Sequence, residues 1–280
     1  MPFITVGEHR LHYLDSGRDG PTIVLTHGLT LDAQSLRYQI EDLRHEYRVI
    51  VWDQRNHGRS SVWPEPHDFW DSADDLACLL DALGIDDAVV GGTSQGGFVS
   101  MRFALRYPER CAGLVLVATH AGSTKHGWAS SLGASVRTWV EQGPCEGFIN
   151  HLRRVTGTIG WEDEQRWIAT LRTRPAWWMG KVYDTIVRRD DIHHLLGALE
   201  VPVLVIEGEH DPMVTRAMVD RMCAAIPTIA RRAIIPGAGH SPMQTHPDQV
   251  NQLLRDYLRA LDVREPWAAT AHLQASYASL

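Results

Sequence analysis

The sequence predicts an α/β fold with a mostly parallel central sheet, flanking helices and an inserted helical cap. Three observations lead to this prediction. Short runs of Val, Ile and Leu recur along the chain, segments with helical periodicity lie between them, and this alternation stops between residues 120 and 199. With 280 residues, 44% of them hydrophobic and 22% charged, the chain has the composition of an ordinary globular protein.

The expected strands are an N-terminal hairpin and a series of buried strands. FITVGEHRLHYLDSG (3–17) alternates apolar and polar residues around Gly7, as an antiparallel hairpin does. Continuous apolar runs suit strands that are covered on both faces, as in a parallel sheet. Five such runs are TIVLTHG (22–28), YRVIVWD (47–53), DAVVGGT (87–93), AGLVLVAT (112–119) and VPVLVIEG (201–208). A weaker sixth example is RAIIPGAG (232–239).

Helices are expected between these strands. LDAQSLRYQIEDLRHE (31–46) carries Leu36, Ile40 and Leu43 at helical spacing. SADDLACLLDALG (72–84) begins with a serine that can cap a helix and ends in glycine. FVSMRFALRYPER (98–110) continues as a helix and stops near Pro108. Because strand and helix alternate, right-handed crossovers between parallel strands are expected.

Residues 120–199 are expected to form the helical cap, because they contain helical fragments and no convincing buried strand. They also hold six of the ten tryptophans: Trp128, Trp139, Trp161, Trp167, Trp177 and Trp178. The predicted core therefore comprises residues 1–119 and 200–264. Residues 265–280 show little pattern and are expected to be a loosely held C-terminal tail.

Charge and local composition limit the classes of protein. The formal net charge of -7 argues against a general nucleic-acid-binding protein, which usually carries a basic face. The first thirty residues lack the pattern of a secretory signal, and no apolar run reaches membrane-spanning length. The four cysteines are scattered without a CxxC pair, so we expect them to be reduced. These features predict a cytoplasmic monomer or homodimer that contacts neither nucleic acid nor membrane.

The stretch GGTSQGG (91–97) contains a candidate nucleophile, Ser94. Gly92 to Gly96 fit the pattern G-x-S-x-G, with a predicted buried strand before it and a predicted helix after it. In this context the serine occupies a tight, strained turn, and the flanking glycines leave room for it. Its hydroxyl then lies beside a helix N-terminus, which favours developing negative charge. The alternative is that Ser94 only caps a glycine-rich helix start.

A serine hydroxyl needs a base, and the base needs an orienting carboxylate. The favoured base is His240, in the glycine-rich turn of GAGHSPMQTHP (237–247), with His246 as its competitor. The favoured acid is Asp211, in the loop after VPVLVIEG, with Glu209 next. Each favoured residue follows the carboxyl end of a different predicted strand, where active-site residues of parallel sheets gather.

The order Ser94, Asp211, His240 resembles that of α/β-hydrolase-fold enzymes, and the likeness covers nearly the whole chain. The chain is similar to serine esterases and lactonases of this superfamily that have a helical cap. THG (26–28) resembles the oxyanion loop of the family, which implies that the backbone N–H groups of Leu29 and Gln95 bind the oxyanion.

The segment VWDQRNHGRSS (51–61) resembles the D-x-R-G-x-G-x-S loop of the same family, with Asn56 in place of a glycine. Asparagine accepts left-handed backbone geometry better than most residues. We interpret this loop as mainly structural, although its histidine, His57, could approach the site.

A serine nucleophile favours acyl transfer, so the predicted activity is hydrolysis of a carboxylic ester or lactone through an acyl-enzyme. The alternative within the fold is a C–C bond hydrolase of meta-cleavage diketones, although the loop HGLTLD is less rich in glycine than is typical of those enzymes. An alternative of another class is a non-catalytic receptor that binds a ligand on the same fold. Neither a cofactor nor a metal is expected, because the pair His193-His194 lacks further ligands at metal-binding spacing.

The cap segment WEDEQRWIATLRTRPAWWMG (161–180) is the predicted substrate pocket. Arg172 and Arg174 in this segment could meet a substrate carboxylate. The alternative is that these tryptophans pack the cap helices together or onto the core. The candidate apolar lining residues are Trp161, Trp167, Trp177, Trp178 and Met179.

Overall fold

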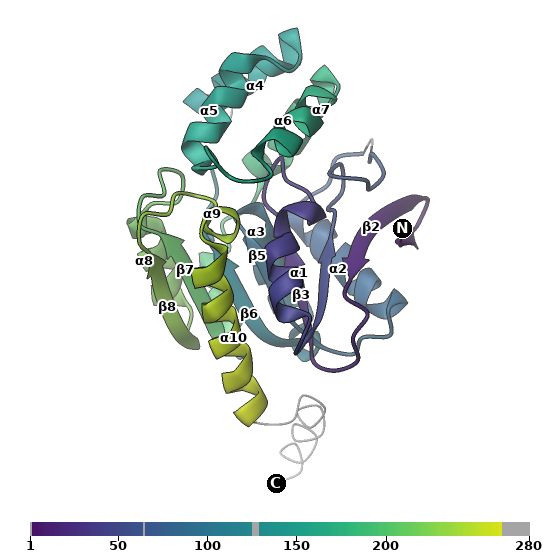
Figure 1. Cartoon of the computed structure of the whole chain (residues 1–280), viewed down its shortest axis with the longest axis vertical. Helices are drawn as coiled ribbons and strands as arrows, with labels where there is room; N and C mark the ends of the chain where they lie inside the picture. Colours follow the sequence, from purple (N-terminus) through teal and green to yellow (C-terminus); the bar gives the residue numbers. More distant parts are fainter. Residues whose placement is uncertain (1, 64, 125–128, 265–280) are drawn as a thin grey trace.

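In the computed structural model, an eight-stranded sheet has the strand order β1-β2-β4-β3-β5-β6-β7-β8 (Figure 1). The structure describes residues 2–63, 65–124 and 129–264. The pairs β1–β2 and β2–β4 are antiparallel, and the remaining pairs are parallel. The mostly parallel sheet and the N-terminal hairpin are therefore confirmed. The strands are β1 (Phe3–Val6), β2 (His9–Asp15), β3 (Thr22–Thr26), β4 (Arg48–Trp52), β5 (Ala88–Thr93), β6 (Cys111–Val117), β7 (Val203–Gly208) and β8 (Ile229–Ile235).

Helices follow most of the parallel strands and cover both faces of the sheet. Short 3-10 turns occur at Ala33–Leu36, Pro108–Arg110 and His193–Ala198. The α-helices are α1 (Arg37–Leu43), α2 (Phe69–Ala82), α3 (Gln95–Arg106), α4 (Ser131–Gln142), α5 (Glu146–Thr156), α6 (Glu164–Arg172), α7 (Ala176–Arg188), α8 (Arg216–Ala225), α9 (Pro242–Thr245) and α10 (Pro247–Arg264).

Helix α2 begins earlier than the sequence pattern predicted. Asp68 is its N-cap, and the Asp68 carboxylate accepts hydrogen bonds from the backbone N–H groups of Trp70 and Asp71. The Asp71 side chain accepts in return from the backbone N–H of Asp68 at 2.8 Å, which completes a capping box. The predicted serine cap, Ser72, instead lies inside the helix. Asp68 and Asp71 bind the free N–H groups at the start of the helix, which therefore begins one turn before Ser72.

The inner strands β3, β5 and β7 are buried along their whole length, because both faces of the sheet are covered. Successive strand residues point to opposite faces. On one face, Val24 and Val90 belong to a core cluster with residues of α2 and α3. On the other, Leu25 and Val89 belong to a cluster with residues of α1 and α10. The sheet therefore lies between two hydrophobic cores.

Helices α4, α5, α6 and α7 form a separate layer at the top of Figure 1. They share a hydrophobic cluster of their own, which includes Trp139 and Phe148. The Trp167 indole donates to the carbonyl oxygen of Thr30, after β3, at 3.1 Å, so this layer lies over the carboxyl ends of the strands. The boundaries at residues 120 and 199 stay predictions. Trp128 and the predicted tail, 265–280, lie outside the described residues.

No helix among the described residues combines the length and the apolar character needed to cross a bilayer.

Candidate active site

Ser94 lies in a strained turn between β5 and α3. Its backbone angles are φ 53° and ψ −113°, a conformation that a residue with a side chain rarely adopts. A Cβ atom at Gly92 would lie 2.4 Å from the carbonyl carbon of Gly96, and one at Gly96 would lie 2.1 Å from the carbonyl oxygen of Thr26. Both contacts are far shorter than van der Waals distance. Glycine at these two positions therefore allows the start of α3 to pack directly against β5 and β3.

Three polar side chains form a continuous hydrogen-bonded row. His240 Nε2 lies 2.9 Å from Ser94 Oγ, and His240 Nδ1 lies 2.7 Å from Asp211 Oδ2. The other carboxylate oxygen of Asp211 accepts from the backbone N–H groups of Met213 and Val214, at 2.8 and 3.0 Å. With Asp211 accepting at Nδ1, the neutral imidazole presents an unprotonated Nε2 to the serine. The arrangement can take a proton from the Ser94 hydroxyl.

The loops after β7 and β8 approach each other closely, which brings Asp211 and His240 together. A Cβ atom at Gly208 would lie 2.0 Å from the carbonyl oxygen of Gly239. The backbone N–H of His210 also donates to the carbonyl oxygen of Ala238 at 2.8 Å. Glycine at position 208 therefore permits the contact between the two loops.

The competing candidates bind other partners. Glu209 accepts a hydrogen bond from the backbone N–H of Gly237 at 2.9 Å. His246 Nδ1 lies 2.9 Å from the hydroxyl oxygen of Thr245. The structure therefore brings Asp211 and His240 to Ser94, rather than these alternatives.

The loop after β3 runs beside the serine. A Cβ atom built on Gly28 would lie 3.6 Å from Ser94 Cβ, and Leu29 lines the cavity that contains Ser94. Gln95 is the first residue of α3, where backbone N–H groups have no acceptor within the helix. The positions of Leu29 and Gln95 are compatible with the predicted oxyanion hole, which stays a prediction.

A cavity of about 580 Å³ opens onto Ser94 and His240. This volume is within the range of small-molecule sites. Its apolar wall includes Leu29, Leu31, Phe98, Leu132, Leu152, Trp167, Ile186, Met213, Val214 and Met218. Its polar wall includes Thr30, Ser123, Thr156, His120, Arg189, Asp191, His193 and Arg221.

Of the five predicted substrate-binding residues of the cap, Trp167 lies on the wall of this cavity. Trp161, Trp177, Trp178 and Met179 do not lie on this wall. Trp161, Trp178 and Met179 are buried in the hydrophobic cluster of the cap layer, whereas Trp177 is 46% exposed. Trp178 and Met179 lie on the buried face of α7, which packs within this cluster.

The two cap arginines also lie elsewhere. Arg172 forms an ion pair with Glu146 at 2.6 Å, and Arg174 donates to the carbonyl oxygen of Gly58 at 3.1 Å.

The loop of residues 51–61 is held by its own contacts. Asp53 accepts hydrogen bonds from the backbone N–H groups of Ala33 and Arg59, at 2.7 and 2.9 Å, and lies 2.8 Å from His12 Nδ1. Asn56 has φ 64°, which confirms the expected left-handed geometry. His57 is buried against His27 and Trp178 and is not on the wall of the Ser94 cavity. Burial, followed by the neighbouring His27, holds its pKa well below the usual range.

The sequence interpretation missed several residues of the cavity, notably Phe98, His120 and Arg189. His120 follows β6 closely, so its place at a strand end is a signal that could have identified it. Burial, followed by the neighbouring Arg189, lowers the pKa of His120 to about 4. Arg189 carries no comparable signal, because it lies in a charged segment of the cap.

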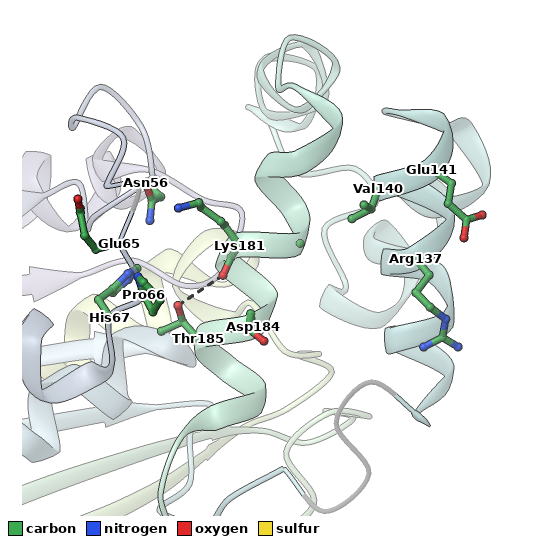
Figure 2. Close-up of a pocket in the computed structure, with 11 residues that line it drawn as sticks. Asn56, Glu65, Pro66, His67, Arg137, Val140, Glu141, Lys181, Asp184 and Thr185 are labelled. Atoms are coloured by element: carbon green, nitrogen blue, oxygen red, sulfur yellow. Dashed lines mark hydrogen bonds between the residues drawn. The ribbon is translucent and has the colours of Figure 1, made fainter.

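A second cavity, of about 400 Å³, lies between residues 65–67 and helices α4 and α7 (Figure 2). Its wall carries both signs of charge, including Glu65, Lys181 and Asp184, and it does not include Ser94. Within the described ranges, no group of three or more His, Cys, Asp or Glu residues could hold a metal ion. The row of Ser94, His240 and Asp211 therefore marks the larger cavity as the candidate active site.

Comparisons with known proteins find relatives over most of the chain. The family model described as alpha/beta hydrolase fold matches residues 21–178, and the model described as TAP-like protein matches residues 180–266. A putative carbamate hydrolase, RutD, of Azorhizobium caulinodans is 28% identical over 277 residues, which cover 94% of this chain and 100% of that protein. The bifunctional esterase/perhydrolase DCH of Acinetobacter calcoaceticus is 28% identical over 284 residues, which cover 89% of this chain and 96% of that one.

Among solved structures, a thermophilic esterase from Thermogutta terrifontis superposes with a TM-score of 0.82 and 31% sequence identity. The superposition covers 92% of this chain and 96% of the esterase.

Proposed function

This chain belongs to the α/β-hydrolase superfamily and is a hydrolase, and we propose that it cleaves a carboxylic ester or lactone through an acyl-enzyme on Ser94. The observation that carries the proposal is the unbroken row from Ser94 Oγ through His240 to Asp211. The hydrolases among its relatives favour an enzyme over the non-catalytic receptor.

In the first half of the proposed reaction, His240 Nε2 accepts the proton of Ser94 while Oγ attacks the carbonyl carbon of the substrate. The electron pair of the C=O π bond moves to oxygen, and the backbone N–H groups of Leu29 and Gln95 donate to this oxyanion. One such donor is worth about 2.7–4 kcal/mol of transition-state stabilisation. The oxyanion then collapses, the bond to the leaving oxygen breaks, and His240 donates its proton to that oxygen.

In the second half, His240 accepts a proton from water, and the water oxygen attacks the carbonyl carbon of the acyl-enzyme. Collapse of this second intermediate breaks the bond to Ser94 Oγ, which regains a proton from His240. The products are an acid and an alcohol, or one hydroxy acid when the substrate is a lactone. Asp211 accepts from Nδ1 throughout, so it stabilises the imidazolium and fixes its tautomer.

Steady-state turnover of a substrate panel tests this proposal. The panel contains p-nitrophenyl esters of short acids, γ-lactones and a meta-cleavage diketone. We expect turnover of the esters or lactones and a loss of about a thousandfold or more in kcat for Ser94→Ala. Ser72→Ala is the control, because Ser72 is a buried serine within α2. Cleavage of the diketone without any ester or lactone turnover would instead identify a C–C bond hydrolase.

A further inference from the structure

Arg189 places a positive charge on the wall of the Ser94 cavity without a carboxylate partner. The residue is only 7% exposed. Its Nε donates to the carbonyl oxygen of Gly122 at 2.8 Å, and its Nη1 donates to the carbonyl oxygen of Ile186 at 2.9 Å and to the hydroxyl of Thr124. All these acceptors are neutral, and among the described residues Arg189 forms no ion pair. Buried charges in proteins are usually paired, so an arginine of this kind is unusual.

The fourth contact of Arg189 brings two hydrogen-bond donors together. Its Nη2 lies 3.0 Å from His120 Nε2, while the backbone N–H of Gly122 donates to His120 Nδ1 at 3.1 Å. A neutral imidazole has one N–H and one acceptor nitrogen. Because Nδ1 accepts, Nε2 carries the hydrogen, and a guanidinium has no acceptor to offer it. Two N–H groups therefore lie side by side and lack a shared acceptor.

The carboxylates closest in sequence to Arg189 bind other residues. Asp190 forms an ion pair with Arg102. Asp191 accepts from the backbone N–H of His193 at 3.0 Å, and its carboxylate lies 2.7 Å from His193 Nδ1 and 3.5 Å from Arg221. Burial, followed by the positive charge of Arg102, lowers the pKa of Arg189 to about 10, so the guanidinium stays charged at neutral pH.

Arg189 and His120 share a wall with the nucleophile. The guanidinium carbon lies 4.4 Å from the ring centroid of Phe98, and the ring centroids of Phe98 and His120 are 5.6 Å apart. Phe98 is one helical turn after Ser94 in α3. The hydroxyl of Thr119, the residue before His120, donates to the carbonyl oxygen of Ser94 at 2.8 Å. A group that contacts both Arg189 and His120 therefore lies within the same cavity as the reacting carbonyl.

The geometry points to a carboxylate subsite, in which Arg189 Nη2–H and His120 Nε2–H together bind a carboxylate of the substrate. This inference rests on the proposed function and narrows its substrate class. The substrate is a monoester of a short dicarboxylic acid, or a lactone that bears a carboxylate. The carboxylate supplies the acceptor that the two N–H groups lack and neutralises the guanidinium, and a planar guanidinium suits it well.

A matched pair of substrates tests the subsite. One is the p-nitrophenyl monoester of glutarate, and the other is the same ester with the free carboxylate replaced by a primary amide. From the usual strength of a hydrogen bond to a charged group, we expect the native enzyme to prefer the anionic ester roughly 10- to 150-fold in kcat/KM. Arg189→Gln is expected to remove this preference. Arg172→Gln, which deletes an exposed cap arginine, is expected to keep it.

A second measurement needs no variant, because Arg189 also ties cap residues together and Arg189→Gln could fail to fold. Glutarate should inhibit the native enzyme more strongly than glutaramate, its monoamide, by a similar factor. Equal kcat/KM for the two esters and equal inhibition would overturn the subsite while ester hydrolysis stands. A preference retained in folded Arg189→Gln would also overturn it. If no ester and no lactone is cleaved, the proposed function fails, and the subsite fails with it.

Discussion

The side-chain amide of Gln95 donates a hydrogen bond of 2.9 Å to Oε1 of Gln54. The amide of Gln54 in turn donates to the backbone carbonyl oxygen of His27 at 2.7 Å. Both glutamines are buried. These two bonds connect the turn at Ser94, the loop after β4 and the loop after β3. They therefore link the two backbone segments that contain the proposed oxyanion donors, Leu29 and Gln95.

We predict that Gln54→Leu lowers kcat on ester substrates about tenfold with little change in KM, because displaced N–H donors weaken oxyanion binding. Steady-state kinetics on a p-nitrophenyl ester measures kcat and KM separately. Gln39→Leu is the matched control, since Gln39 is an equally buried amide that donates to the carbonyl oxygen of Met243 and to Asn251. An unchanged kcat in Gln54→Leu, or an equal loss in Gln39→Leu, would contradict the positioning role.

The glycine at position 96 should not tolerate even one methyl group. Gly96→Ala would place a Cβ 2.1 Å from the carbonyl oxygen of Thr26, so we expect a loss of about 1–3 kcal/mol in the free energy of unfolding and loss of activity. Gly147→Ala is the control, because Gly147 lies in α5 with nothing within 4 Å of the added Cβ. That change should be neutral or stabilise by about 0.5–1 kcal/mol. Urea unfolding measures both, and equal stabilities would contradict the steric account.

The tryptophans of the cap should separate into a structural and a substrate-facing group. Trp178 is 2% exposed and its indole donates to the carbonyl oxygen of Asn56 at 2.6 Å, so Trp178→Ala should destabilise the fold by about 3–5 kcal/mol. Trp177→Ala should have a much smaller effect, because Trp177 is 46% exposed. Trp167→Phe should alter the preference for acyl-chain length, since Trp167 lines the cavity. Thermal unfolding and a series of p-nitrophenyl esters measure these effects. Equal destabilisation by Trp177→Ala and Trp178→Ala would contradict them.

The free energy of unfolding should be lower at pH 5.5 than at pH 7.5. Burial lowers the pKa of His67 and of His120 to about 4 in the folded chain, below the usual value of about 6.5 in the unfolded chain. In this window the unfolded chain binds protons at these positions and the folded chain does not, so acid favours unfolding. Between pH 7.5 and pH 5.5, each histidine should lower the free energy of unfolding by about 1 kcal/mol.

Urea unfolding at the two pH values measures this loss of stability. His67→Gln should reduce the difference by its own share, because glutamine does not titrate. If the native protein were equally stable at both pH values, the two histidines would have to ionise alike in the folded and unfolded chain.

Much of the fold could be predicted from local pattern. The apolar runs of β3, β5 and β7 are continuous because helices cover both faces of the sheet, and such runs can be recognised in sequence. The turn at Ser94 was also predictable, since its glycines are spaced by the steric needs of one local structure. Asp211 and His240 could be proposed because active-site residues gather at strand ends.

The cavity wall could not be predicted in the same way, because it depends on which face each cap helix presents to the cavity. Trp177 and Trp178 are adjacent in sequence, yet Trp177 is nearly half exposed and Trp178 is buried. Arg188 and Arg189 show the same effect. Arg188 pairs with Asp184 on the surface of α7, while Arg189 turns inward to the cavity. A charged segment of this kind has the appearance of a solvated surface, and only the tertiary packing distinguishes its members.

The central claim is that Ser94 is a nucleophile activated by His240. Intact-protein mass spectrometry after treatment with a fluorophosphonate tests it most directly. The account predicts a single adduct that maps to Ser94, that is absent in Ser94→Ala, and that forms much more slowly in His240→Ala. An unlabelled native protein, or an adduct on another residue that persists in Ser94→Ala, would contradict it.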